Sequence, residues 1–247
     1  NSSEEKMHID WSQREIALRA KLDQFKEKFK DRAWDCIVPI SGGKDSFWQA
    51  YLLTQVYGMR PLAVTFSHNW FTKTGKENLD LLLESFDLDH MMYTPKRSLI
   101  NRVARRSIEK IGDSCWHCHA GIGSFVIHTA IKFNVPLIIW GESTAEEGCR
   151  LSYFESTKRD VFDENYFTKI SARQDVDAMA SKELPARDLE MFRYPTKEEY
   201  QSADIQGFHL GDYMFWDEER HTEFIKEQFG WKEDAVAGTY KKYKSVE

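Results

Sequence analysis

The chain has 247 residues, of which 41% are hydrophobic and 30% are charged, with 13 glycines and 6 prolines. This composition excludes collagen-like, low-complexity and disulfide-framework proteins, and the length suits one large domain or one domain with a smaller extension. The formal net charge of −6 argues against a broad nucleic-acid-binding surface, which needs a basic face, so nucleic acid is not an expected partner.

The sequence predicts neither a membrane segment nor an oxidising compartment. The longest apolar run, residues 135–140, is far shorter than the roughly 20 residues of a helix that crosses a bilayer. The four cysteines, two of them in a Cys-x-x-Cys pair, fit a reducing environment better than an oxidising one. We therefore expect a cytoplasmic protein without a membrane partner.

Hydrophobic residues recur along most of the chain with spacings that alternate between those of helices and those of strands. Helical spacing predicts helices over residues 5–30, 46–57, 75–86, 98–111 and 121–133. Short apolar runs predict buried strands over residues 36–40, 61–66, 90–94 and 136–140. After residue 150 the pattern weakens, and residues 176–205 and 215–229 are expected to be mainly helical.

Strands separated by helical segments predict βαβ units, and hence an α/β fold with a doubly wound, mostly parallel sheet. We expect an N-terminal helix over residues 1–30, the α/β domain over 31–175 and a helical C-terminal extension over 176–247. Ligands of such sheets bind beyond the carboxyl ends of the strands. Residues 41–46, 65–72 and 141–150 should therefore converge there.

The strongest chemical signal is the loop Ser41-Gly42-Gly43-Lys44-Asp45-Ser46, which joins the first predicted strand to a helix. Adjacent glycines permit positive φ and close approach of the backbone to a ligand. The first N–H groups of the helix, the Lys44 ammonium and two serine hydroxyls favour an anion with several phosphate oxygens. Asp45 would repel that anion unless a cation lies between them, and Mg²⁺ prefers oxygen ligands. The loop thus predicts a polyphosphate bound together with Mg²⁺.

The loop differs from the two common glycine-rich nucleotide loops. The pattern G-x-x-x-x-G-K-[ST] requires a glycine at position 38 and a hydroxyl residue at position 45, where the chain has Val38 and Asp45. The loop does not fit the dinucleotide pattern G-x-G-x-x-G either.

Instead, residues 41–46 resemble the pyrophosphate-binding loop of the N-type ATP pyrophosphatases, the PP-loop superfamily, which includes NAD synthetase, GMP synthetase, asparagine synthetase and tRNA-thiolating enzymes. The resemblance implies an adenine nucleotide alpha hydrolase-like sheet, ATP as cofactor, and cleavage of ATP to AMP and pyrophosphate. It implies that a substrate oxygen attacks the α-phosphate and that an amine or sulfur nucleophile then displaces AMP. It implies that the whole loop binds the nucleotide and that its last three residues act in catalysis: Lys44, Asp45 and Ser46.

Five longer segments are distinctive: residues 35–46, 61–65, 134–142, 211–217 and 238–243. They resemble one branch of this superfamily, the N-acetyl sugar amidotransferases of surface-polysaccharide and flagellin-sugar synthesis. The resemblance implies that an N-acetyl sugar, either a free nonulosonic acid or a nucleotide-linked sugar, is adenylated on its amide oxygen. It implies that ammonia, supplied by a separate glutaminase subunit, then gives an acetamidino sugar.

Carboxylates follow the fourth predicted strand in residues 141–147. This segment is similar to the acidic loop at which NAD synthetase and its relatives bind a second metal, which implies that Gly141 and Glu142 contact the cofactor. Carboxylates there could bridge Mg²⁺ to phosphates, and the expected Mg²⁺ ligands are Asp45, Glu142 and Glu146. The alternative is that the glutamates are solvated loop charges.

Two further residues, Thr65 and Phe66, stand at the tip of the second predicted strand. We expect them to lie near the adenine or the ribose of the nucleotide. Ordinary packing of Phe66 in the core is the alternative.

The pair Cys115 and Cys118 leaves several interpretations open. Cys-x-x-Cys spacing allows two thiolates to reach one metal, and Zn²⁺ would take its other ligands from His117, His119 or Cys149. An iron–sulfur cluster with Cys149 as third ligand is less favoured. A redox dithiol and a pair of inert buried thiols are the remaining alternatives.

The favoured function is an ATP-dependent amidotransferase that forms AMP and acts on an N-acetyl sugar. The first alternative is sulfur transfer of the tRNA-thiolation type, which the cysteine pair favours and the acidic net charge disfavours. The second alternative is a nucleotide-binding module without catalysis.

Overall fold

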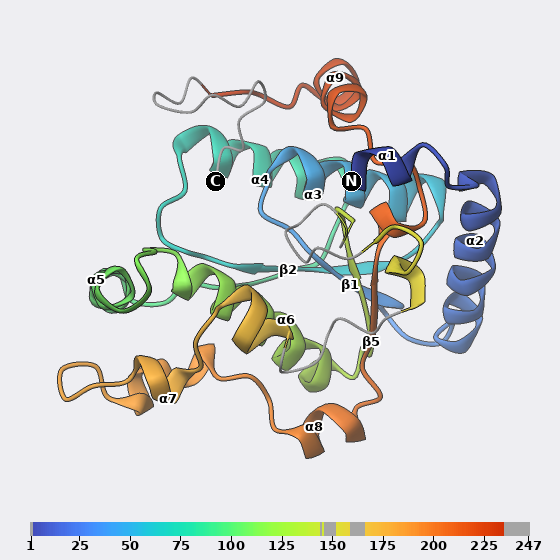
Figure 1. Cartoon of the computed structure of the whole chain (residues 1–247). Coiled ribbons are helices and arrows are strands. Elements are labelled where there is room, and N and C mark those ends of the chain that lie inside the picture. Colours follow the sequence, from blue (N-terminus) through green and yellow to red (C-terminus); the bar gives the residue numbers. More distant parts are fainter. Residues whose placement is uncertain (1, 144, 146–151, 159–165, 235–247) are drawn as a thin grey trace.

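The computed structural model describes residues 2–143, 145, 152–158 and 166–234 (Figure 1). In these residues a five-stranded sheet has the strand order β3-β2-β1-β4-β5, and every neighbouring pair is parallel. The chain winds outward from β1 to β3 and then returns to the other side of β1, so the predicted doubly wound α/β fold is confirmed. The strands are β1 (Cys36–Pro39), β2 (Pro61–Phe66), β3 (His90–Tyr93), β4 (Leu137–Trp140) and β5 (Gln206–His209).

Helices cover both faces of the sheet (Figure 1). One face packs against α2 (Trp11–Lys28), α3 (Lys44–Tyr51), α4 (Lys73–Phe86) and α9 (Glu218–Phe229). The other face packs mainly against α6 (Trp116–Phe133), which α5 (Arg97–Ile111) flanks. Because both faces are covered, alternate residues of β1 enter different cores: Val38 packs with the first group of helices and Ile37 with α6.

The N-terminal region holds two helices rather than the one predicted over residues 5–30. After α1 (Ser2–Lys6) the chain turns, and α2 begins where the Asp10 carboxylate accepts a hydrogen bond from Gln13 N at 3.0 Å. Asp at this capping position satisfies an N–H group that the helix itself leaves unpaired. None of the described helices combines the length and apolarity needed to cross a membrane.

The C-terminal region differs most from expectation. Residues 176–205 form two short α-helices and one 3₁₀ helix instead of a mainly helical segment, because Pro185 and Pro195 interrupt helical hydrogen bonding. These elements are α7 (Val176–Met179), η4 (Ala186–Phe192) and α8 (Lys197–Ser202), and the remaining short helices are η1 (Leu52–Val56), η2 (Ser156–Lys158), η3 (Tyr166–Ser171) and η5 (Leu210–Asp212).

Strand β5 was missed by the sequence analysis, which placed no strand after residue 150. It is four residues long and contains Gly207, so it gives no recognisable alternating pattern. It pairs in parallel with β4 along its whole length, from Leu137 opposite Gln206 to Trp140 opposite His209. The segment 176–247 therefore contributes a strand to the sheet, while the proposed domain boundaries at residues 30 and 175 remain a prediction.

Candidate active site

A cavity of about 370 Å³ lies at the carboxyl ends of the strands. Its volume falls in the range typical of ligand pockets, about 300–1,000 Å³. It spans the point where the strand order reverses between β1 and β4, which is the usual binding crevice of an open α/β sheet. The described parts of the three segments expected to converge all reach it, through residues such as Ser41, Phe66 and Glu142. We call it the loop cavity.

Gly42 fixes the loop against α4. Its φ is +84°, and a Cβ at this position would lie 2.7 Å from Leu79 N and 2.8 Å from Gly75 O, both backbone atoms of α4. Its carbonyl accepts a hydrogen bond from Nε1 of the buried Trp231 at 3.0 Å. The loop is therefore held between α4 and the C-terminal segment, and the conformation requires glycine.

The two serines of the loop brace its backbone. Ser41 Oγ accepts from Gly43 N at 3.3 Å, while Ser46 Oγ accepts from Ser41 N at 3.2 Å and donates to Gly43 O at 3.0 Å. Both residues also line the loop cavity. Gly43 is the N-cap of α3 and has no side chain to cap the first N–H groups of the helix, which suits them to an anionic ligand.

Lys44 is 7% exposed and pairs with carboxylates. Its Nζ forms an ion pair with Asp45 and a second one with Glu218 Oε2 at 3.4 Å. Burial alone would lower the pKa of Lys44, but Asp45, Glu218 and Glu142 outweigh burial and raise its pKa above the usual value. The ammonium thus stays charged, at the edge of the loop cavity rather than among its lining residues.

Two carboxylates, Asp45 and Glu142, line the loop cavity. Asp45 Oδ1 accepts from Nε1 of the buried Trp216 at 3.2 Å, and its other oxygen meets Lys44. Two carboxylates fit Mg²⁺, which keeps several waters and takes further oxygen ligands from phosphates. Among the described residues no group of three acidic, His or Cys side chains could bind a metal by itself. Glu146, the third expected ligand, lies outside the described residues.

The segment after β4 is held in place by the chain that follows β5. Gly211 N donates to Gly141 O at 2.8 Å, and a Cβ on Gly211 would lie 2.4 Å from Ser143 N. Nδ1 of His209 hydrogen-bonds the carbonyl of Glu142, and Ser143 Oγ donates to Asp212 Oδ1 at 2.6 Å. These contacts fix the backbone from which Glu142 reaches the loop cavity.

Side-chain alternation in β2 separates the two residues expected near the base. Val64 and Phe66 line the loop cavity, whereas Thr65 points to the opposite face. Thr65 Oγ1 donates to Ile40 O at 2.8 Å and lies 2.9 Å from His90 Nε2, so its buried hydroxyl is already bonded. The structure therefore brings Phe66 to the loop cavity and leaves the Thr65 side chain away from it.

The cysteine pair is divided between two environments. Cys118, in the first turn of α6, lines the loop cavity together with His119, whereas Cys115 precedes the helix and does not. Cys118 Sγ lies 3.5 Å from His117 Nε2, and burial lowers the pKa of His117 to about 4. The described residues show no group able to hold Zn²⁺ or an iron–sulfur cluster here, and Cys149 lies outside them.

Comparison with known proteins gives no family. No protein-family model matches the chain, and no curated protein matches it. Among solved structures, NMN synthetase from Francisella tularensis is 14% identical with a TM-score of 0.43, covering 92% of this chain and 89% of that one. The NH₃-dependent NAD synthetase from Campylobacter jejuni is 15% identical with a TM-score of 0.42, covering 93% and 100%. A predicted tRNA methyltransferase subunit from Methanocaldococcus jannaschii is 15% identical with a TM-score of 0.41, covering 78% and 74%. Because these sequence identities and TM-scores are low, the activities in the three names describe those proteins and are not transferred to this chain.

The sequence predicts that the loop binds ATP with Mg²⁺, and replacing Trp216 by phenylalanine is expected to weaken that binding without unfolding the protein. Phenylalanine keeps an aromatic ring at this buried position although it is smaller than the indole, and Asp45 loses an indole donor. A hydrogen bond to a charged group contributes about 1.5–3 kcal/mol. We expect the dissociation constant of ATP, measured by calorimetry at limiting Mg²⁺, to rise by about tenfold or more. Trp48→Phe is the matched control, because Trp48 Nε1 has no partner among the described residues. Equal effects of the two substitutions would contradict the role given to the Trp216 indole.

The free energy of unfolding should decrease as pH falls from about 6.5 toward 4. Burial lowers the pKa of His117, His209 and His221 to about 4 each, so the fold keeps them neutral while the unfolded chain takes up protons. Urea unfolding across this range would measure the slope. His209→Asn keeps a donor toward Glu142 O and should reduce proton uptake by about one. An unchanged slope in that variant would be inconsistent with a neutral buried His209.

Proposed function

We propose that the chain is an ATP-dependent amidotransferase that activates an amide oxygen and releases AMP and pyrophosphate. The observation that carries the proposal is the convergence in one cavity of a glycine-fixed loop, an uncapped helix N-terminus and two carboxylates, with a buried lysine beside them. Helix N-termini and backbone N–H groups stabilise polyphosphates, and a lysine beside them adds charge stabilisation. ATP is the polyphosphate that the chain's resemblance to PP-loop enzymes implies.

Each loop residue has a role that follows from its contacts. Gly42 and Gly43 let the backbone approach the phosphates, and the Ser41 and Ser46 hydroxyls keep that backbone in shape. Lys44 stabilises the negative charge that develops on the departing pyrophosphate. Asp45 and Glu142 would hold Mg²⁺, which neutralises the phosphate oxygens when it is bound. Trp216 orients Asp45 through its indole N–H.

The substrate that we propose is an N-acetyl sugar, whose amide oxygen is adenylated and then replaced by ammonia. An amide oxygen is a poor leaving group, and its adenylate is a good one, which is why the reaction needs ATP cleaved at the α-phosphate. The ammonia would come from a separate glutaminase subunit. The sugar and the glutaminase both follow from the resemblance of residues such as 35–46 and 211–217 to the N-acetyl sugar amidotransferases.

The proposal is tested by measuring AMP in the presence of ATP, Mg²⁺, ammonium and a panel of N-acetylated sugars. The panel includes nonulosonic acids and nucleotide-linked diacetamido sugars. We expect AMP to form only when both ammonium and one of the sugars are present. A complete absence of AMP with every sugar would contradict the amidotransferase proposal.

Sulfur transfer is the second candidate, because Cys118 lines the same cavity as the loop and lies beside the neutral His117. In that reaction Cys118 would carry the sulfur that displaces AMP. The two candidates differ in their response to Cys118→Ser. The amidotransferase should retain ammonium-dependent formation of AMP and product in this variant, whereas a sulfur carrier should lose product formation while it still adenylates its substrate.

A further inference from the structure

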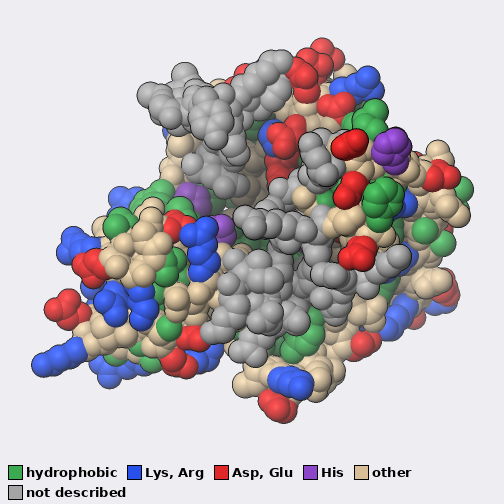
Figure 2. All heavy atoms as spheres, in the orientation of Figure 1, with side chains coloured by type: hydrophobic (Ala, Val, Ile, Leu, Met, Phe, Trp, Pro, Cys, Tyr) green, Lys and Arg blue, Asp and Glu red, His purple; other side chains and the backbone are tan. Residues whose placement is uncertain are grey.

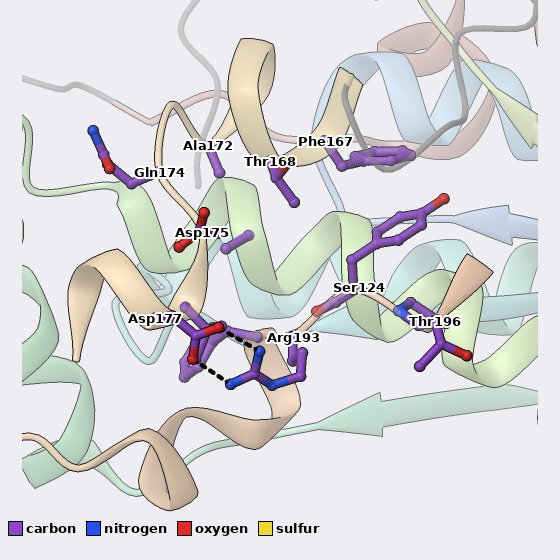
Figure 3. Close-up of a pocket in the computed structure, with 14 residues that line it drawn as sticks. Ser124, Phe167, Thr168, Ala172, Gln174, Asp175, Asp177, Arg193 and Thr196 are labelled. Carbon is purple, nitrogen blue, oxygen red and sulfur yellow. Dashed lines mark hydrogen bonds and ion pairs between the residues drawn. The ribbon is translucent and has the colours of Figure 1, made fainter. Parts of the chain in front are cut away.

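A second cavity, of about 250 Å³, lies on the other side of α6 from the loop cavity. Its lining comes from α6, η3, the residues that enter α7 and the segment that joins η4 to α8. In the view of Figure 3, Phe167 and Thr168 lie above α6 and the pair Asp177 and Arg193 lies below it. We call it the η3 cavity.

The charged side chains of the η3 cavity are one arginine and two aspartates, and one of the aspartates is paired with the arginine. The Arg193 guanidinium donates to both oxygens of the Asp177 carboxylate at 2.8 and 3.1 Å (Figure 3). Asp175 is the other charged residue of the described lining, and its carboxylate caps α7 by accepting a hydrogen bond from Ala178 N at 2.8 Å. The local net charge of about −1 disfavours a phosphate, and the paired carboxylate and guanidinium together accept and donate hydrogen bonds.

The rest of the lining is amphipathic. Hydroxyl side chains come from Ser124, Thr168 and Thr196, and aromatic rings come from Phe167, Phe192 and Tyr194. A binding site that combines apolar walls with a few placed polar groups suits a small molecule with the same mixture. A ring compound with several hydroxyl or amide groups has both properties, since its ring faces are apolar and its edges form hydrogen bonds.

The η3 cavity and the loop cavity share one wall. Phe167 lines both, and it lies directly on α6, because a Cβ on Gly123 would be 2.4 Å from its ring. The neighbouring α6 residues Gly123 and Ser124 face different cavities. A substrate seated in the η3 cavity therefore lies one side chain away from the space beside the loop.

We infer that the η3 cavity binds the uncharged, hydroxyl-bearing ring of the acceptor substrate, with Asp177 and Arg193 forming hydrogen bonds to its edge. The η3 cavity differs in charge from a groove on α5, and this difference supports an uncharged ligand in the η3 cavity. Lys and Arg side chains gather over α5 and the segment after α7 (Figure 2), where Arg102, Arg105 and Arg106 line a separate groove. The role of the η3 cavity as acceptor site rests on the proposed function, whereas binding of the ring compound does not.

The inference is tested on the full chain with N-acetylglucosamine, N-acetylgalactosamine and N-acetylmannosamine as probes in saturation-transfer NMR. At least one probe should bind the wild-type chain. Arg193→Gln and Asp177→Asn should each weaken its binding by about tenfold, the factor for one charge-assisted hydrogen bond, and should leave the dissociation constant of ATP unchanged. Arg102→Gln is the matched control, because Arg102 forms a similar surface ion pair with Asp188 at 3.2 Å.

The outcomes separate this inference from the proposed function. Absence of transfer to all three probes, or equal binding by wild type and both η3-cavity variants, would overturn the inference. AMP formation with an unchanged KM for the acceptor in these variants would overturn it while leaving the amidotransferase intact. Probe binding that depends on Arg193 and Asp177, without AMP formed from any sugar, would support the site and contradict the enzyme proposal.

Discussion

Lys44→Ala should lower the kcat/KM of AMP formation by about 10²–10³, the usual effect of removing one group that stabilises developing negative charge. The wild-type ammonium is buried, stays charged and meets Asp45 at the start of α3. Without it, the loop retains its backbone donors but loses the full charge that offsets the departing pyrophosphate. Steady-state assays with ATP as the varied substrate would measure the loss.

Lys73→Ala is the control for this experiment. Lys73 also begins a helix, α4, and pairs with a carboxylate, Glu77 at 3.7 Å, but its side chain is 91% exposed. Surface ion pairs of this kind contribute about 0–1 kcal/mol, so the variant should keep wild-type activity. If Lys44→Ala were as active as Lys73→Ala, Lys44 would have no part in the reaction.

Gly42→Ala should destabilise the protein and weaken binding of ATP. The new Cβ would lie 2.7 and 2.8 Å from backbone atoms of α4, which cannot move as a flexible side chain can. A φ of +84° adds about 1–2 kcal/mol for an L-residue, and forced overpacking adds about 1–3 kcal/mol. Urea unfolding should therefore show a loss of about 2–5 kcal/mol, and calorimetry should show weakened binding of ATP.

The matched control is Gly58→Ala, which separates the two causes. Gly58 also has a positive φ, +63°, but a Cβ there would meet nothing within 4 Å. In Gly58→Ala only the cost of a positive φ should remain, so the free energy of unfolding should fall by about 1–2 kcal/mol. ATP binding should stay unchanged. Similar losses of stability in both variants would show that contact with α4 does not constrain the loop.

The sequence was sufficient to predict the part of the site that is local in the chain. The apolar runs before and after residues 41–46 predicted β1 and α3, and parallel pairing then required the ends of β1, β2 and β4 to meet. Phe66 and Glu142 reach the loop cavity for that reason. Thr65 is adjacent to Phe66, but its side chain does not line the loop cavity, because the side of β2 that faces the cavity could not be assigned from the sequence alone.

The part that could not be predicted consists of contacts between distant segments. Trp216 and Trp231 bind the loop through single indole donors, and Glu218 reaches Lys44 across more than 170 residues of chain. These side chains belong to no periodic hydrophobic pattern. Strand β5, which precedes them in the chain, has only four residues and is too short to show a pattern. The resemblance of residues 211–217, which include Trp216, was the available signal, but it gave no role to any of these residues.

The most direct test of the proposed chemistry uses ATP labelled on its α-phosphate, incubated with the full chain, Mg²⁺, ammonium and the acceptor panel. The loop cavity, which Asp45 lines and Lys44 adjoins, should direct cleavage between the α- and β-phosphates, so the label should appear in AMP. Label that remained in ATP, or that appeared in ADP instead, would contradict the assignment of this loop to an AMP-forming enzyme.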